Sequence, residues 1–233
     1  MIASKSIAIF ILSLLVSAIS ASGQGNQPDV YLKFRALALN YPHNSGIYLA
    51  PTGGSPIRIY SNSRTDWVEY SGPNPITFYV DDKNAKNESI RTPIASVDIS
   101  MAPESPLLVF SKSSAEDKFY NISVIDDSVE ISPPGSYRIF NFTTKQIAGM
   151  IDDQKFLLSP KTTAYAKVSN PKDFEVTVKL AESANGKAKR LYASTWTFSE
   201  NFRYLVMIIP SNDRTRGNID IRLIPDLIHA DQS

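Results

Sequence analysis

Short runs in which apolar and polar residues alternate follow one another along most of the chain. In residues 30–39, Val30, Leu32 and Phe34 alternate with more polar neighbours, and a period of two is typical of a half-buried β-strand. Residues 174–180 repeat this pattern most clearly. After the N-terminal apolar segment, no window has the i, i+3, i+4, i+7 apolar spacing of an amphipathic helix. We therefore expect an all-β chain of about a dozen or more strands.

Residues typical of turns separate the predicted strands. Residues 40–46 and 81–91 are rich in polar or charged side chains, and we expect both to be exposed loops. Asn185-Gly186 is a strong signal for a hairpin turn. The predicted strands cover residues 30–39, 47–50, 57–60, 67–70, 76–80, 94–100, 107–111, 119–125, 137–142, 146–151, 155–158, 163–168, 174–180, 191–198, 203–209 and 218–224.

The stretch 133–168 holds four of these strands, separated by short turns. It begins with Pro133-Pro134-Gly135, which breaks any preceding strand. Strands joined by such turns predict an antiparallel meander whose apolar face packs against another layer. We therefore expect a second domain to begin at residue 133.

A weak internal repeat supports a division into two halves. The matched segments are residues 107–110 with 204–209, residues 120–127 with 218–226, and Arg35 and Asn40 with Arg138 and Asn141. Halves of this size are typical of immunoglobulin-like sandwiches. We expect two tandem immunoglobulin-like antiparallel β-sandwich domains, at residues 30–132 and 133–227, followed by a tail at residues 228–233. One larger sandwich or barrel is the alternative.

Two apolar segments dominate the last hundred residues: YRIFNFTTKQIAGMIDDQKFLLSPKTTAYAKV at 137–168 and YLVMIIPSNDRTRGNIDIRLIPD at 204–226. In the first, a strand, an Asn, a short turn and a strand ending in Leu-x-Pro follow one another, and the second is an apolar hairpin. This order resembles that of a group of uncharacterised exported bacterial β-sandwich proteins. The resemblance implies an exported bacterial protein and brings no catalytic motif with it.

The first 22 residues have the organisation of a secretory signal peptide. Lys5 precedes an uncharged apolar segment at residues 7–19, and small residues follow at 20–23, as signal peptidase requires. The apolar segment is shorter than an ordinary membrane span; an uncleaved N-terminal anchor is the alternative. We expect residues 1–22 to be removed and residues 23–29 to form a polar tether. The mature chain is then exported, to the periplasm or the extracellular space, with no membrane span.

Composition limits the chemistry of the chain. There is no cysteine, which excludes disulfides, thiolate nucleophiles, Cys-based zinc sites and a lipoprotein anchor. The 24 basic and 23 acidic residues become equal in number when Lys5 leaves with the signal peptide, so we expect no binding to nucleic acid, which needs a basic surface. Neither His43 nor His229 belongs to a metal-binding or catalytic-triad motif, and no Gly-x-Ser-x-Gly elbow occurs.

Three pairs of adjacent aspartates follow apolar runs: Asp81-Asp82, Asp126-Asp127 and Asp152-Asp153. Carboxylates in loops at strand ends are suitable ligands for Ca²⁺, and Asp126 and Asp127, near the predicted domain boundary, are the best candidates. The alternative is that these residues only end strands and form turns. A third hypothesis is a hydrolase that uses two of the carboxylates as acid and nucleophile.

Aromatic residues gather between residues 60 and 79. Trp67, Tyr60 and Tyr70, together with Arg64, form a candidate ligand-binding surface, because exposed rings beside hydrogen-bonding groups bind sugars and peptides. We expect Trp196, by contrast, to lie in the core, as a Trp of a β-sandwich commonly does.

The sequence favours a non-catalytic exported protein with a binding or structural role in the cell envelope or the extracellular space. It has no assembled catalytic motif, and exposed strand edges bind extended peptides by strand addition. We expect a protein, peptide or glycan as the partner, and Ca²⁺ is the one candidate cofactor. A carbohydrate- or calcium-dependent binding module is the alternative.

Overall fold

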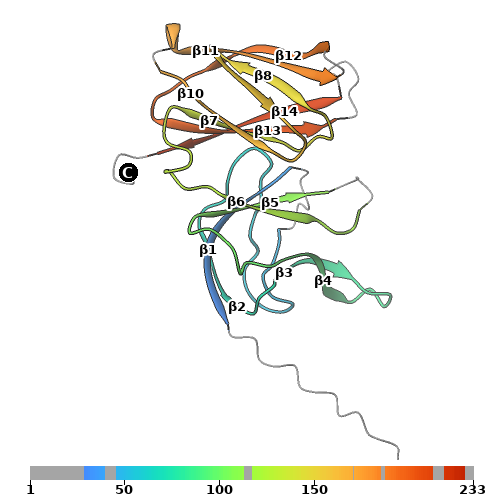
Figure 1. Cartoon of the computed structure of the whole chain (residues 1–233). Coiled ribbons are helices and arrows are strands. Elements are labelled where there is room, and N and C mark those ends of the chain that lie inside the picture. The colour runs from blue at the N-terminus through green and yellow to red at the C-terminus, as the bar shows by residue number, and fades with distance from the viewer. Residues whose placement is uncertain are drawn as a thin grey trace, which may run out of the picture.

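The computed structural model describes residues 29–39, 46–112, 117–169, 171–184, 187–211 and 218–228. These residues form an all-β chain, as the sequence predicts (Figure 1). The strands are β1 (Val30–Ala38), β2 (Val68–Gly72), β3 (Ile76–Lys83), β4 (Ser89–Val97), β5 (Pro106–Ser111), β6 (Asn121–Asp126), β7 (Ser136–Asn141), β8 (Ile147–Ile151), β9 (Gln154–Leu158), β10 (Thr163–Lys167), β11 (Glu175–Ala184), β12 (Lys187–Thr197), β13 (Phe202–Pro210) and β14 (Ile219–Leu227). A short 3₁₀ turn, η1 (Lys172–Phe174), precedes β11.

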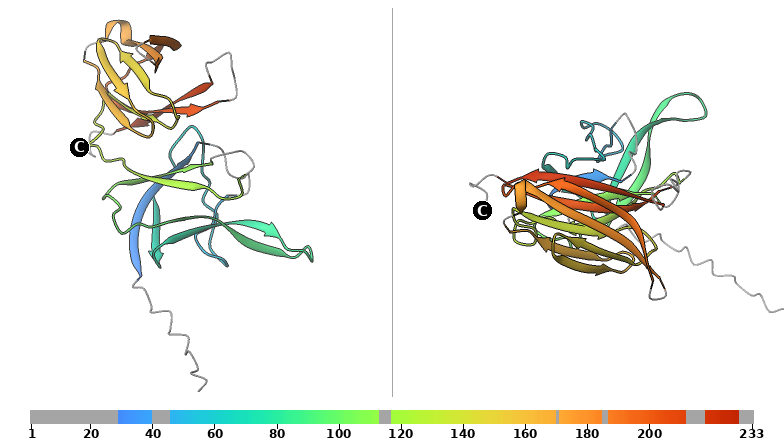
Figure 2. Two further views of the ribbon diagram at one scale, coloured as in Figure 1. Left: turned by 45° about the vertical axis from the view of Figure 1, so that its right-hand side comes forward. Right: turned by 90° about the horizontal axis from the view of Figure 1, so that it is seen from above.

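Within the described residues, the strands make three sheets of four strands and one of two. The strand orders are β2-β1-β5-β6, β10-β7-β13-β14, β12-β11-β8-β9 and β3-β4. The two sheets formed by β7 to β14 lie face to face at one end of the molecule, and the strands of the first half lie at the other end (Figures 1 and 2). The arrangement is sandwich-like.

Alternation along the strands explains how the C-terminal pair of sheets buries its core. In β11, Val176, Val178 and Leu180 are at most 3 % exposed, whereas the residues between them are exposed. Complete burial of one such aliphatic side chain stabilises the fold by about 1.5–3 kcal/mol. Trp196 belongs to the same core, as predicted, and its indole N–H donates a hydrogen bond to the Tyr192 hydroxyl (2.8 Å).

The two halves of the chain repeat one strand arrangement. In each half an opening strand runs parallel to a later strand, which then forms an antiparallel hairpin with the last strand: β1, β5 and β6, then β7, β13 and β14. The registers agree, because Arg35 lies opposite Leu107 and Arg138 lies opposite Leu205. By these registers the following residues are equivalent: Arg35 and Arg138, Leu37 and Phe140, Leu107 and Leu205, Val109 and Met207, Ile125 and Ile224, and Asp127 and Asp226.

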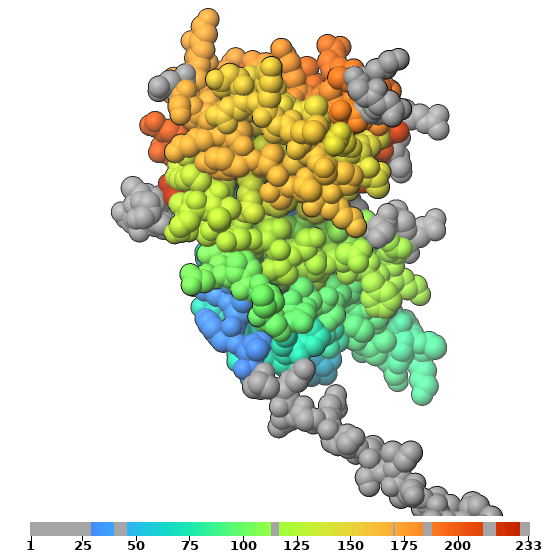
Figure 3. All heavy atoms as spheres, in the orientation of Figure 1, coloured from blue at the N-terminus to red at the C-terminus, as the bar shows by residue number. Residues whose placement is uncertain are grey.

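Equivalent residues of the two halves also pack against each other. Besides one apolar core within each half, a third core contains residues of both the β2-β1-β5-β6 sheet and the β10-β7-β13-β14 sheet. Figure 3 shows the two halves lying directly against each other. The buried members of the third core are Leu37, Leu39, Leu107 and Val109 from the first half and Phe140, Leu205, Met207, Ile209 and Ile224 from the second. Because equivalent residues contribute from both sides, the contact resembles the isologous interface of a two-fold dimer.

The predicted meander over residues 133–168 is wrong. β8 and β9 form an antiparallel hairpin, but β7 lies in the opposite sheet and β10 pairs with β7. The buried side chain of Asn141 organises the crossing from β7 to β8. Its amide donates to the carbonyls of Lys145 (2.7 Å) and Ser159 (3.1 Å), and its oxygen accepts hydrogen bonds from the backbone N–H (3.0 Å) and hydroxyl (2.7 Å) of Thr143.

Two other local predictions also need correction. Residues 81–91, predicted as an exposed loop, are largely a hairpin, because β3 continues to Lys83 and β4 begins at Ser89. Asn84 makes the turn possible, since its side-chain oxygen accepts hydrogen bonds from two backbone N–H groups in the turn. The hairpin predicted from residues 47–50 and 57–60 is reduced to a single bridge between Ile47 and Ile57.

Several predictions fall on residues outside the described ranges. They include the signal peptide, nearly all of the tether and the tail, both histidines, and the Asn185-Gly186 turn. Within the described ranges, no helix has the length and apolar character needed to span a membrane.

Candidate functional site

Five charged side chains from both halves form a cluster close to the third core. Arg35 is in β1, Arg64 is in the segment before β2, and Asp127 directly follows β6; Arg203 is in β13 and Asp226 in β14. Their side chains range from 1 % exposed for Asp127 to 16 % for Asp226. We call these five residues the Arg–Asp cluster.

Strand pairing positions the two carboxylates of the cluster. The backbone N–H of Asp127 donates to the carbonyl of Ser105 (2.8 Å), which continues the β5–β6 ladder by one residue. Asp226 lies opposite Arg203 in the β13–β14 ladder. These are equivalent positions of the repeat, so the pairing of the two halves brings both carboxylates to the same group of arginines.

Three guanidinium groups surround the carboxylate of Asp127. Arg64 binds it through two nitrogens, with Nε 2.8 Å from Oδ2 and Nη2 3.0 Å from Oδ1. Arg35 Nη2 lies 2.6 Å from Oδ2, and Arg203 Nη2 lies 3.5 Å from the same oxygen. The bidentate contact of Arg64 with this carboxylate is directional as well as strong.

The same arginines contact Asp226. Arg35 binds it through both terminal nitrogens, each 3.1 Å from a carboxylate oxygen. Arg203 Nε and Nη2 lie 2.9 and 2.7 Å from Oδ2. The remaining nitrogen of Arg203, Nη1, donates to the backbone carbonyls of Asp127 (2.8 Å) and Ser128 (2.9 Å). Arg203, from the second half, therefore binds both the backbone and the carboxylate of the first half.

Mutual pairing makes burial of these charges tolerable. Burial would raise the pKa of Asp226, but the positive charges of Arg64 and Arg35 and the hydrogen bonds from Arg35 and Arg203 outweigh it and lower that pKa below its ordinary value. With three cations and two anions, the cluster carries one excess positive charge. Two of its buried nitrogens, Arg35 Nε and Arg64 Nη1, have no hydrogen-bond partner.

Arg138, the equivalent of Arg35, is not a member of the cluster. Its guanidinium donates to the backbone carbonyl of Asp126 and lies 5.0 Å from the centre of the Phe140 ring. Burial lowers the pKa of Arg138. The repeat is thus symmetric in its apolar contacts and its two aspartates but not in its arginines.

The candidate calcium ligands have other partners in this structure. Asp127 is surrounded by guanidinium groups, and a divalent cation beside three positive charges is electrostatically disfavoured. Asp126 accepts a hydrogen bond from the backbone N–H of Ser128 (2.9 Å), which is the turn-forming role of an aspartate. Among the residues the structure describes, no group of three or more His, Cys, Asp or Glu side chains is placed to hold a metal ion.

The candidate ligand-binding residues divide into two exposed and two buried side chains. Trp67 and Tyr60 are 45 % and 42 % exposed, so both rings are open to solvent. Tyr70 is buried and its hydroxyl donates to the carbonyl of Pro73 (2.6 Å), while Arg64 is held within the Arg–Asp cluster. The four side chains therefore do not form one exposed surface, and ligand binding by Trp67 and Tyr60 stays a prediction.

Trp67 is associated with the Arg–Asp cluster through its ring. The guanidinium carbon of Arg35 lies 5.0 Å from the ring centre, and Lys33 Nζ lies 5.9 Å from it. Both separations are typical of cation–π contacts. Trp67 thus packs against Arg35 while leaving much of its own ring exposed.

Inspection of the sequence did not identify Arg203 or Asp226 as site residues. The internal repeat could have indicated Asp226. When residues 120–127 are aligned with 218–226, Asp127 and Asp226 both fall at the end of their segments. The pairing of two distant acids with the same arginines depends on how the halves pack, which no local pattern encodes. In comparisons with known proteins, no protein-family model and no curated protein matches this sequence.

Proposed function

We propose that this chain is an exported, non-catalytic binding protein of the cell envelope or the extracellular space. In this proposal two tandem immunoglobulin-like sandwiches, residues 30–132 and 133–227, act as one scaffold for an extended segment of another protein. The observation that carries the proposal is the Arg–Asp cluster, in which the most buried acids of the junction serve to join the two halves. Carboxylates that are fully paired with guanidinium groups can hold two parts of a fold together, but they are poorly suited to proton transfer.

The sheet edges supply the means of binding. In the β12-β11-β8-β9 sheet β12 is an outer strand, and in the β10-β7-β13-β14 sheet β14 is an outer strand. Outer strands present backbone donors and acceptors that another extended chain can pair with. A scaffold whose two halves are fixed to each other holds such edges in a constant orientation, which lowers the entropic cost of binding.

The test is site-specific photo-crosslinking in the organism that encodes the chain. A photoreactive amino acid is placed singly at exposed positions on different surfaces: Tyr31, Phe119, Lys155 and Ala193. The proposal predicts a defined adduct with one identifiable protein, formed from one surface only, and an intact mass for the exported chain that lacks residues 1–22. Failure of every position to give an adduct would contradict the binding role.

A second candidate is carbohydrate binding, which the exposure of Trp67 favours. A half-exposed indole flanked by Lys33 and Arg35 offers a stacking face beside hydrogen-bond donors. Titration of the purified protein with a panel of soluble glycans, followed by Trp fluorescence, tests this. A saturable change that Trp67→Phe abolishes would support the candidate, and no change with any glycan would exclude it for that panel.

A further inference from the structure

The two halves differ at the edge where the last strand of one sheet meets the outer strand of the facing sheet. We call the space between these two strands the opening of the half. In the first half the opening is closed, because the backbone N–H of Tyr120, next to β6, donates to the carbonyl of Ile94 in β4 (2.7 Å). The Tyr120 ring is 6 % exposed and packs edge-on against Phe110, with ring centres 6.3 Å apart. An extended backbone and an aromatic side chain therefore complete the first core.

In the second half the equivalent residues are smaller. By the registers of the two hairpins, Ile219 corresponds to Tyr120 and Ile208 to Phe110. Beside Ile219 lies a pocket of about 640 Å³ between β14 and β12. This volume is in the range of ordinary ligand-binding sites.

The opposite edge of the same sandwich is closed. There the Gln154 side chain accepts a hydrogen bond from the backbone N–H of Lys167 (3.1 Å) and so joins β9 to β10.

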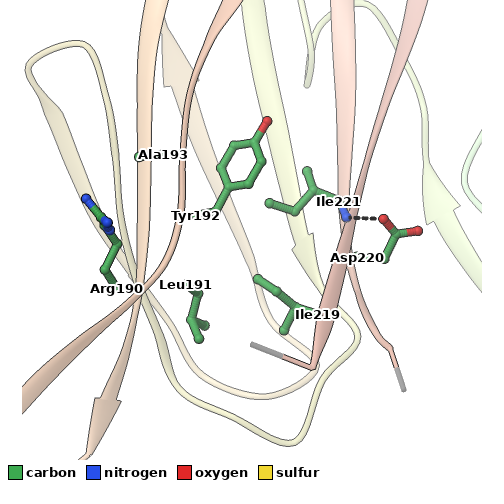
Figure 4. A pocket seen from close by; sticks show the side chains of 7 residues that line it. All are labelled: Arg190, Leu191, Tyr192, Ala193, Ile219, Asp220 and Ile221. Carbon is green, nitrogen blue, oxygen red and sulfur yellow. Dashed lines mark hydrogen bonds between the residues drawn. The ribbon is translucent and has the colours of Figure 1, made fainter. Parts of the chain in front are cut away.

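The walls of this pocket come from both edge strands and combine apolar side chains with the charged residues Arg190 and Asp220. Figure 4 shows Ile221 of β14 directed toward Tyr192 of β12, with Leu191 and Ile219 nearby and Arg190 and Asp220 at the two outer sides. Tyr192 is held in place by the hydrogen bond from the indole of Trp196. We call this pocket the β12–β14 groove.

The two edges of the groove are not equally open to an added strand. On β14 the Asp220 carboxylate accepts a hydrogen bond from the backbone N–H of Ile221 (3.0 Å), which occupies a donor that an added strand would need. On β12 the neighbouring Ala193 is small, and the exposed side chains of Lys189 and Arg190 give this edge a positive charge. The β11–β12 register shifts at Leu191, because Leu180 lies opposite Tyr192 and Ala181 opposite Arg190. The regular part of this edge, from Tyr192 onward, is therefore favoured over β14 for an added strand.

We propose that the β12–β14 groove binds an extended protein segment that adds to the outer edge of β12. Its aromatic or branched apolar residue fills the space against Ile219, Ile221 and Tyr192, as Tyr120 does in the first half, and an acidic residue lies near Lys189 and Arg190. This inference rests on the proposed function and specifies its partner by chemistry. The first half supplies the template, and the charge of β12 supplies the complement.

The probe that tests the groove is a synthetic peptide of residues 117–126, DKFYNISVID, which carries Asp117, Tyr120, Ile122 and Val124 of the first-half template. It is titrated into the ¹⁵N-labelled mature protein and followed by amide chemical shifts. The expected result is a Kd of about 0.1–1 mM, with shifts confined to residues 189–194 and 219–223. The peptide with Tyr120→Ala binds roughly tenfold more weakly.

Two variants and a matched control distinguish binding of the peptide in the groove from nonspecific binding to the protein surface. Leu191→Glu and Ile221→Thr place polar groups in the groove and should each weaken binding about tenfold. Ile90→Thr alters an exposed isoleucine of the first half and should bind like the unaltered protein. Shifts elsewhere in the chain, or none at about 1 mM peptide, would overturn the inference.

Crosslinking distinguishes failure of this inference from failure of the proposed function. An adduct formed from Tyr31, Phe119 or Lys155 but not from Ala193 would leave the binding role intact and overturn the groove as its site. Peptide binding in the groove without an adduct at any position would support the groove and contradict the proposed function. An adduct at Ala193 that Leu191→Glu abolishes would support both.

Discussion

Asp127 and Asp226 occupy equivalent positions in the two repeats, and each is within 4 Å of all three arginines of the Arg–Asp cluster. Neither carboxylate is therefore tied to its own half alone. Arg35 and Arg64 come from the first half and Arg203 from the second. The two repeats are joined by charges that are satisfied only when both are present.

Removing one carboxylate should destabilise the whole chain. Asp127→Asn leaves three buried guanidinium groups with a single anion, and breaking a buried pair in this way costs about 3–5 kcal/mol. The free energy of unfolding measured by urea titration gives the value directly. Asp153→Asn, at an exposed position, is the matched control and should change stability by less than about 0.5 kcal/mol. Equal effects of the two substitutions would show that the cluster adds no stability.

Acid should weaken the junction through Asp226. Because the arginines hold its pKa below the ordinary 3.8, the stability it contributes is present above pH 3.8 and is lost as the pH falls through the lower folded-state pKa. Asp98, whose pKa is lowered to about 2 by hydrogen bonds from Ser100 and Asn74, adds to the same acid sensitivity. Urea midpoints measured between about pH 5 and pH 2.5 should therefore fall less steeply for Asp226→Asn than for the unaltered protein. Identical slopes would contradict this role of Asp226.

The two tryptophans should differ in their access to solvent. Trp67 is 45 % exposed and Trp196 is 8 % exposed, so acrylamide should quench only part of the total fluorescence efficiently. Trp67→Phe should remove that accessible component and leave the emission of Trp196, which is bonded to Tyr192. Efficient quenching that survives in Trp67→Phe would mean that Trp196 is not in the core.

Calcium should not stabilise the protein. Since Asp127 is already neutralised by guanidinium groups, Ca²⁺ would have to displace them, and a cation that does not bind the folded state leaves the melting temperature unchanged. Differential scanning fluorimetry with millimolar Ca²⁺ and with a chelator tests this. A melting temperature that rises with Ca²⁺ concentration would support the calcium-binding prediction for Asp126 and Asp127.

Most strand positions could be predicted from the sequence, whereas the pairing of strands that are distant in the sequence could not. Alternation such as that of Val176, Val178 and Leu180 is a local property, and it marks a strand wherever it lies. Pairing depends on contacts between distant segments. The short turn after β7 looked like a hairpin turn, but Asn141 uses its side chain to carry the chain across to the opposite sheet. Local turn chemistry was therefore misleading at this point.

The candidate site was predictable only in part for a similar reason. Asp127 and Arg64 were singled out for separate roles, as a metal ligand and as a ligand-binding residue, and the structure brings them into direct contact. Burial decides the difference, because a buried charge requires a partner that an exposed one does not. No local pattern shows which side of β1 the second half covers.

Calorimetric unfolding of residues 23–233 tests the central claim most directly, namely that the Arg–Asp cluster and the third core make one unit of the two repeats. We predict a single transition with equal calorimetric and van't Hoff enthalpies for the unaltered protein. Arg203→Met, which removes the guanidinium from both carboxylates, should lower the transition temperature and split the transition in two. Two independent transitions in the unaltered protein, or an unchanged trace for Arg203→Met, would contradict the claim.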